Sequence, residues 1–251
     1  MLNMKLEQTF FVGVQDVDAK KRITNKALIE MISNISMLHG VVAGQTSAEG
    51  VSPVSWIVIG WKLKVYERPR MFSTLRVQTW AQSYEKVKAN RDYIVYDEAG
   101  RIIAKATAVW VPIDVKSGRF LRVTPEHMAP FEPEPDEQNF PDFSFPALRK
   151  FELPILQRLE VRAERSMVDY NNHVHNSNYL DLADMVLPEA VYKKTYDDVM
   201  IIYKQEIYFG DMLSLEYSEK EGKEYVAIRS ADNGKLHALI VLSEENNTSL
   251  V

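Results

Sequence analysis

The sequence predicts an α+β fold made of two copies of one unit, each combining a helix with an antiparallel sheet. Two observations support this prediction. In each half, one amphipathic helical segment is followed by several strand-like segments, without the strand–helix alternation that gives a parallel sheet. The order of these elements in the first half recurs in the second, and each copy has the size of a common domain.

The first half contains one long helical pattern. Residues 9–17 are strand-like and end in the polar run 16–22. From Asn25, apolar residues recur at three- and four-residue steps, with Thr24 or Asn25 as the expected N-cap and Gly40 or Gly44 as the expected end. The stripe comprises Leu28, Met31, Ile32, Ile35 and Leu38. Strands are expected at 54–66, 74–83, 86–96 and 101–111, the last ending at Pro112, with a hairpin turn at 97–100.

A proline-rich segment separates the halves. Residues 125–154 hold seven of the eleven prolines and an acidic run at 132–137. Prolines at this density disfavour regular helix and sheet, which predicts an extended linker. The expected division is therefore an N-terminal unit at 1–124, a linker at 125–154 and a C-terminal unit at 155–251.

The second half repeats the first. Strand-like residues 151–168 lead into the polar run 169–176 and a helical stripe at 179–187 that ends near Pro188. Strands are expected at 200–208, 212–219, 224–230 and 235–242, with a hairpin turn at 231–234. Setting Asp18 against Asp169 also aligns Ile23 with Val174, which supports a duplication.

Only the second copy concentrates reactive side chains. Asp169, Asn171 and His173 alternate just before the helix, so on an extended backbone they would share one face. Backbone N–H groups at a helix N-terminus favour developing negative charge. The aligned first-half positions hold Asp18, Lys20 and Arg22. We therefore expect catalysis in the second half, with a polar loop that merely caps the helix as the alternative.

Composition excludes several classes of protein. The net charge of −5 argues against a nucleic-acid binder, which usually has a basic face. With no cysteine, the chain has no disulfide, thiolate ligand or cysteine nucleophile, and the pair His173 and His175 lacks a third ligand for a metal site. No apolar run is long enough to span a membrane, and the start of the chain does not read as a secretory signal. A cytoplasmic location is expected.

The motif Asp169-x-Asn171-x-His173-Val174 followed by Asn and Tyr resembles the active-site segment of acyl-acyl carrier protein thioesterases. The likeness covers most of the chain, including 12–44, 61–80, Arg91-Asp92-Tyr93, 107–111 and 116–119. The resemblance implies a tandem hotdog fold, in which each half wraps an antiparallel sheet around a long helix. It also implies hydrolysis of the thioester between a fatty acyl chain and the carrier protein's phosphopantetheine arm, without a cofactor.

Carried over by position, the family's catalytic Asp, Asn and His fall on Asp169, Asn171 and His173, and its further carboxylate falls on Glu206. Ile207 occupies a position where the family has Cys, so a cysteine nucleophile is excluded, and His175 replaces the usual Asn.

Attack by water is the expected mechanism, because no Gly-x-Ser-x-Gly nucleophile elbow is present. Water needs a general base and a group that stabilises the developing oxyanion. Glu206 is the favoured base, because a carboxylate on a mid-sheet strand could be buried enough to raise its pKa; Asp169 is the alternative. Asn171 could position water or the carbonyl, His173 could orient a group or protonate the thiolate, and N–H groups at 176–179 could polarise the carbonyl.

The first half is expected to hold the acyl tail, with Met31 and Ile35 as the first candidates for its wall. An acidic carrier protein would dock on a basic cluster, for which the candidates are Lys20, Lys21, Arg22, Arg68, Arg70 and Arg149. A coenzyme-A thioesterase, a hotdog dehydratase or hydratase, and a non-catalytic acyl-binding module remain alternatives. The sequence leaves chain length and oligomeric state open, a homodimer included.

Overall fold

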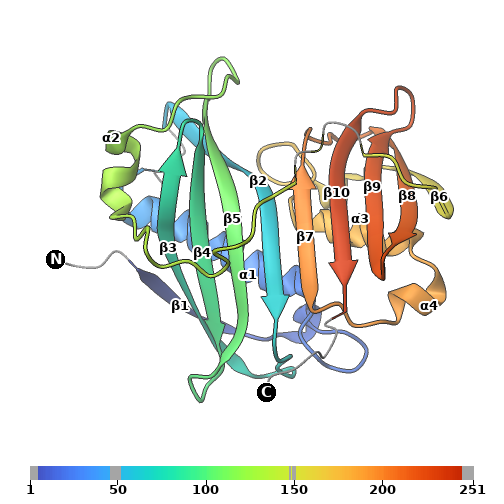
Figure 1. Ribbon diagram of the computed structural model, residues 1–251, viewed down its shortest axis with the longest axis horizontal. Helices are drawn as coiled ribbons and strands as arrows, with labels where there is room; N and C mark the ends of the chain where they lie inside the picture. The colour runs from blue at the N-terminus through green and yellow to red at the C-terminus, as the bar shows by residue number, and fades with distance from the viewer. Residues whose placement is uncertain (1–4, 46–51, 147, 149–150, 245–251) are drawn as a thin grey trace. The chain divides into compact units, whose positions relative to one another are not determined.

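The computed structural model describes residues 5–45, 52–146, 148 and 151–244 (Figure 1). The chain divides into two compact units, unit 1 (Met1–Phe143) and unit 2 (Ser144–Val251). The division falls inside the predicted linker, between Phe143 and Ser144, so the expected boundaries at 124 and 154 stay a proposal.

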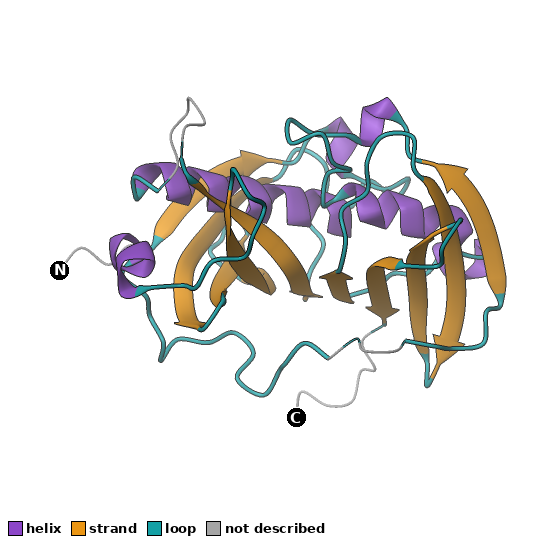
Figure 2. Cartoon of the chain, turned by 90° about the horizontal axis from the view of Figure 1, so that it is seen from above, coloured by secondary structure: helices purple, strands orange, loops and turns teal. Residues whose placement is uncertain are grey.

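Unit 1 wraps a five-stranded antiparallel sheet around helix α1 (Asn25–Val42). Its strands are β1 (Leu6–Phe11), β2 (Val54–Val65), β3 (Thr74–Glu85), β4 (Lys88–Tyr96) and β5 (Ile102–Asp114), in the spatial order β1-β3-β4-β5-β2. Buried residues alternate with more exposed ones along much of β3 and β5, so one side of the sheet faces α1. Figure 2 shows α1 inside the curve of the sheet.

The start of α1 agrees with its sequence signals. The Thr24 side chain accepts a hydrogen bond from the Ala27 N–H at 3.1 Å, and the helix runs past Gly40 to end before Gly44, which is left-handed at φ 67°. The predicted stripe is buried except for Leu38, which is 39% exposed. That part of the prediction is wrong, because the helical period places His39 rather than Leu38 next on the stripe.

In unit 1, the end of β1 and the end of β5 differ from the prediction. Strand β1 ends at Phe11, and residues Val14–Asp16 form a 3₁₀ turn (η1). Strand β5 continues through Pro112 to Asp114. Pairing with β4 stops at Trp110, so Pro112 lies beyond the part of β5 that β4 borders, and its missing N–H costs no bond to β4. Beyond Trp110, β5 pairs with β2, and Ile113 forms a β-bridge with Phe120.

The proline-rich segment contains short helices that the sequence reading excluded. Helix α2 (Pro125–Met128) and the 3₁₀ turn η2 (Ala129–Phe131) both begin near prolines, where a missing N–H costs no helical hydrogen bond. Met128 and Phe131 are buried in a cluster with Ala81, Ala89 and Val123. The first part of the predicted linker is therefore core of unit 1.

Unit 2 has the same plan with a shorter helix. Its strands are β6 (Gln157–Arg162), β7 (Asp198–Tyr203), β8 (Met212–Lys220), β9 (Lys223–Ser230) and β10 (Leu236–Ser243), in the order β7-β10-β9-β8-β6. Helix α3 (Asn178–Val186) buries the predicted stripe, and α4 (Glu189–Tyr192), which was not predicted, follows Pro188. A 3₁₀ turn, η3 (Arg165–Met167), precedes α3.

Each unit is thus a hotdog unit, and the tandem hotdog prediction is confirmed. Among the described helices, none combines the length and apolar character needed to cross a membrane.

Candidate active site

Asp169 closes a tight turn that presents the next polar residues. Its Oδ1 accepts a hydrogen bond from the Asn171 N–H at 2.8 Å, and its own N–H donates to the His173 carbonyl at 2.9 Å. Asn172 adopts a left-handed φ of 63°, which asparagine tolerates better than most residues. The turn leaves Asn171 exposed and His173 half-buried.

His173, Glu206 and Tyr208 meet at this turn. His173 forms a β-bridge with Tyr208, and their rings pack edge to face with centroids 4.9 Å apart. The Tyr208 hydroxyl donates to Glu206 Oε2 at 2.9 Å, and His173 Nε2 lies 3.8 Å from the same oxygen. That hydrogen bond to Glu206, together with burial, raises the pKa of Tyr208. Two predicted site residues, distant in sequence, are therefore neighbours.

The expected burial of Glu206 is wrong. Strand β7 ends at Tyr203, so Glu206 lies beyond the sheet, and its side chain is 45% exposed. The chain leaves the ladder early because the Ile207 carbonyl accepts from the Val174 N–H at 2.8 Å, which draws this segment to the turn before α3. Burial therefore does not favour Glu206 as the base.

Next to the site lies an aromatic pair, Tyr179 and Tyr203, of which Tyr179 is buried. Tyr179, in the first turn of α3, packs edge to face on Tyr203 with centroids 4.9 Å apart, and the Tyr203 hydroxyl donates to the Asn176 carbonyl at 2.7 Å. Burial, together with the charges of Glu206 and Asp169, raises the pKa of Tyr179. Tyr179 is therefore held as a neutral phenol close to both carboxylates.

Some of the hydrogen-bonding groups at the start of α3 are already used in local contacts. The Asn178 N–H donates to the His175 carbonyl at 2.9 Å, and the His175 ring nitrogen Nδ1 lies 3.0 Å from the Ser177 hydroxyl. His175 thus supports the entry to the helix, a role the sequence reading left open. No group of three or more metal-ligating side chains occurs among the described residues.

Unit 1 contains the same turn, with Lys20 and Arg22 in place of the Asn and His of unit 2. Asp18 Oδ1 accepts from the N–H groups of Lys20 and Arg22 at 2.8 and 2.9 Å, as Asp169 accepts from Asn171. The backbone of Arg22 forms a β-bridge with that of Arg70, as His173 does with Tyr208. Both units therefore keep the aspartate that shapes the turn, and they differ in the side chains that the turn presents.

The same comparison locates the counterpart of Glu206. The Ile23 N–H donates to the Pro69 carbonyl at 2.9 Å, as Val174 donates to Ile207, which places Arg68 where unit 2 has Glu206. Arg68 donates to the Ile23 carbonyl at 3.0 Å and to Asn25 Oδ1 at 2.9 Å. A cation bonded to its surroundings replaces the carboxylate of unit 2.

Sequence reasoning did not single out Tyr208 or Tyr203 as site residues. Both flank Glu206 closely in the sequence, and that proximity was the available signal. Their roles depend on the β-bridge and on packing against α3, which no local pattern encodes.

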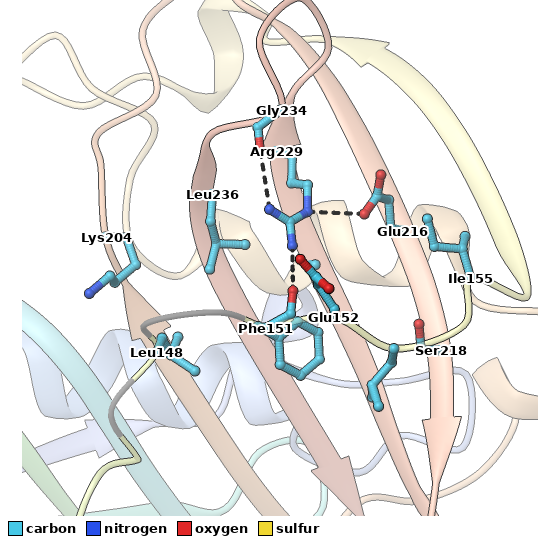
Figure 3. Close-up of a pocket in the computed structure, with 12 residues that line it drawn as sticks. Leu148, Phe151, Glu152, Ile155, Lys204, Glu216, Ser218, Arg229, Gly234 and Leu236 are labelled. Atoms are coloured by element: carbon cyan, nitrogen blue, oxygen red, sulfur yellow. Dashed lines mark hydrogen bonds and ion pairs between the residues drawn. The ribbon is translucent and has the colours of Figure 1, made fainter.

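A hollow of about 530 Å³ lies elsewhere in unit 2, on the sheet face away from α3. Residues 151–155 cross it, and the Arg229 guanidinium bonds to the Phe151 and Gly234 carbonyls and to Glu216 (Figure 3). None of Asp169, Asn171, His173 and Glu206 lines this hollow. It is where the chain entering unit 2 is anchored.

Two family models match the chain. The model described as acyl-ACP thioesterase N-terminal domain matches residues 3–131, and the model described as acyl-ACP thioesterase C-terminal domain matches residues 152–244.

Curated relatives are distant. An oleoyl-acyl carrier protein thioesterase of Coriandrum sativum is 22% identical over 84% of this chain and 61% of its own length. Oleoyl-acyl carrier protein thioesterase 2 of Arabidopsis thaliana is 23% identical over 91% of this chain and 66% of its own length. The chain therefore spans about three fifths to two thirds of the length of these relatives.

Solved structures share the fold over nearly the whole chain. An acyl-ACP thioesterase from Bacteroides thetaiotaomicron superposes with a TM-score of 0.82 at 21% identity, covering 97% of this chain and 98% of that one. The 12:0-ACP thioesterase from Umbellularia californica gives 0.82 at 15% identity, with the same coverage. Because the two family models together account for most of the sequence, the chain belongs to the acyl-ACP thioesterase family.

Proposed function

We propose that this protein hydrolyses fatty acyl-acyl carrier protein thioesters to free fatty acid and carrier protein. The observation that carries the proposal is the meeting of His173 and Glu206, 3.8 Å apart, at the start of α3. It occurs in the unit that the C-terminal family model matches. The relatives named above are oleoyl-acyl carrier protein thioesterases, and the proposal extends that substrate class to this chain.

The reaction adds water across the thioester. A water oxygen bonds to the acyl carbon, the carbon–sulfur bond breaks, and the proton removed from water returns to the thiolate of the carrier's phosphopantetheine arm. The products are a carboxylic acid and a free thiol. The site must therefore hold one proton temporarily and stabilise one oxyanion.

His173 is the better candidate for holding that proton. An imidazole can both accept and donate a proton through its ring nitrogens, and the Glu206 carboxylate lies 3.8 Å from its Nε2. Tyr208 fixes Glu206 through its hydroxyl. Asn171, exposed on the turn that Asp169 closes, is assigned to the water or the acyl oxygen. Glu206 as the direct base, the choice made from sequence, remains the alternative.

Unit 1 is assigned to the acyl tail, with Met31 and Ile35 as the first candidates. Both side chains are buried on α1, at 5% and 0% exposure. The cytoplasmic location expected from sequence stays a prediction, and the oligomeric state stays open.

A panel of thioesters tests the function. Because the chain has no cysteine, a thiol reagent reports only the thiol that the substrate releases. The same acyl group is presented on carrier protein, on coenzyme A and on pantetheine. Hydrolysis with the highest kcat/KM on carrier protein supports the proposal.

Other results of this panel identify the rivals. Preference for coenzyme A would indicate a coenzyme-A thioesterase. Tight acyl-carrier binding without thiol release would indicate an acyl-binding module. Loss of an enoyl or hydroxyacyl substrate without thiol release would indicate a dehydratase or hydratase.

A further inference from the structure

A basic corner borders the candidate active site in unit 2. It consists of Arg162 at the end of β6, Arg165 at the start of η3, and Phe209 between β7 and β8. The guanidinium carbons of Arg162 and Arg165 lie 5.3 and 4.5 Å from the centroid of the Phe209 ring. Both distances are within the range of cation–π attraction, so one ring positions two cations.

Neither guanidinium is neutralised within the part of the chain that the structure describes. Arg162 and Arg165 form no ion pair or hydrogen bond with a described side chain, and both residues are exposed. Other arginines of the same sheet behave differently, because Arg158 and Arg229 both bind Glu216, at 3.0 and 3.1 Å. The basic corner therefore presents two positive charges to an outside partner.

The basic corner is held next to the segment that carries Glu206 and Tyr208. The Gly210 N–H donates to the Ala163 carbonyl, and the Ala163 N–H donates to the Asp211 carbonyl, both at 2.9 Å. Arg162 lies over this turn, with its Nη2 3.6 Å from the position that a Cβ on Gly210 would occupy. The turn begins at Tyr208, whose hydroxyl holds Glu206. A partner bound at the corner would thus lie beside the residues assigned to hydrolysis.

We propose that the basic corner docks the acidic surface of the acyl carrier protein, an inference that rests on the proposed function. The chain carries a net charge of −5, so an acidic partner is repelled overall and needs a local positive surface. Arginine beside a partly exposed aromatic ring is typical of residues that dominate protein interfaces. Phe209 is 40% exposed.

The duplication sharpens this assignment. The first-half residues aligned with Arg162 and Arg165 are Phe11 and Val14, which are exposed and apolar, so the equivalent corner of unit 1 lacks these two cations. The docking candidates from sequence were Lys20, Lys21, Arg22, Arg68, Arg70 and Arg149, all of which except Arg149 belong to unit 1. There Arg22 pairs with Asp18 at 3.3 Å, and Arg68 binds Ile23 and Asn25, so part of that charge is used internally. Arg149 lies outside the described residues.

The test is charge reversal read on two substrates. The variant R162E/R165E is assayed on acyl-carrier protein and on the same acyl group as a pantetheine thioester, which has neither protein nor phosphate. On the carrier substrate at low salt, kcat/KM should fall by about tenfold or more, chiefly through KM, and the difference should shrink at high salt. On acyl-pantetheine, kcat/KM of this variant should stay within about twofold of the wild-type value. R162K/R165K, which keeps the charge, should retain most activity on both.

Several outcomes would overturn the proposal. These are an unchanged KM for carrier protein, an equal loss on acyl-pantetheine, or an equal loss on acyl-phosphopantetheine, which would mean that the arginines bind the arm's phosphate instead. A loss in K20E/K21E but not in R162E/R165E would move docking to unit 1.

If the charge reversal prevents folding, the variant R162Q/R165Q is assayed in its place. Binding of non-acylated carrier protein is measured in parallel, so failure of wild type to release any thiol would count against the proposed function and leave docking separately measurable.

Discussion

Asn172 and Lys21 adopt the same left-handed backbone conformation, with φ of 63° and 60°, at equivalent positions of the two duplicated turns. In each turn an aspartate accepts the N–H two residues on, and a β-bridge closes the ends. The backbone of the site was therefore retained in both halves, while the side chains it presents diverged. Lys21 is the less suitable residue, because a left-handed φ favours Asn or Gly over Lys.

Lys21→Asn is expected to stabilise the protein, and Asn172→Lys to destabilise it, each by a few tenths to about 1 kcal/mol. Asparagine adopts the left-handed region at lower cost, and Lys21 is exposed, so little packing changes. Urea unfolding at neutral pH measures both. Lys20→Asn, next to Lys21 but without a positive φ, is the control and should change stability little. Equal effects at 20 and 21 would contradict the backbone argument.

A buried carboxyl in unit 1 predicts a pH-dependent stability. Burial raises the pKa of Asp92 to about 6, although hydrogen bonds from Thr107 and Asn139 and the charge of Lys105 lower it. The folded pKa thus exceeds the ordinary value of 3.8. The stability from Asp92 is then complete below about pH 4 and is lost as pH rises through about 6, an effect on the order of 3 kcal/mol.

Asp92→Asn should therefore be more stable than wild type at pH 7.5 and lose less stability between pH 4.5 and 7.5. The amide keeps an oxygen for the Asn139 N–H, which donates to Asp92 Oδ2 at 2.7 Å. Unfolding free energies at both pH values measure this. Asp97→Asn is the control, because hydrogen bonds from Arg101 lower the pKa of that carboxyl and its stability effect runs in the opposite direction. A variant less stable than wild type at pH 7.5 would refute the prediction.

The pair His173 and Glu206 predicts non-additive losses of activity. His173→Ala and Glu206→Ala should each lower kcat by about 10²-fold or more, and the double variant should be little worse than either, because the groups act as a unit. Tyr208→Phe, which removes only the hydroxyl bound to Glu206, should cost less. Steady-state kinetics on the preferred thioester measures each variant.

The pH profile separates the two candidate bases. If His173 is the base, the acid limb of kcat/KM disappears in His173→Ala and persists in Glu206→Gln. Glu189→Gln, an exposed carboxylate bonded to Lys193 on α4, is the control and should match wild type. Additive losses in the double variant, or an acid limb that vanishes only in Glu206→Gln, would reassign the base.

Much of this fold could be predicted from local pattern. Strand β2 and helix α1 begin where alternation and the Thr24 cap place them, because those signals are local. Glu206 was misplaced because the end of β7 is set by a contact with Val174, remote in sequence. The site residues were found through a motif, but the approach of Tyr208 to Glu206 and the pairing of Arg162 and Arg165 on Phe209 depend on tertiary packing.

The duplication also predicts a way to change the preferred substrate. If unit 1 holds the acyl tail, Met31→Trp should shift preference to shorter chains, because each buried methylene contributes about 0.8 kcal/mol and two carbons correspond to roughly tenfold in kcat/KM. Met31 is 5% exposed on α1, and its unbranched thioether suits an irregular wall. A series of acyl-carrier thioesters of increasing length measures the shift, with Ile35→Phe as the second variant.

Met37→Trp provides the matched control, because Met37 lies on the same helix but is 41% exposed. It should leave the chain-length profile unchanged. For Met31→Trp, turnover of the new best substrate should stay close to that of wild type, since the residues assigned to hydrolysis belong to unit 2. Overpacking of a core has a different signature, namely a lower melting temperature and equal losses at every chain length. If Met31→Trp and Ile35→Phe both give that result, the two side chains are core and the tail is bound elsewhere.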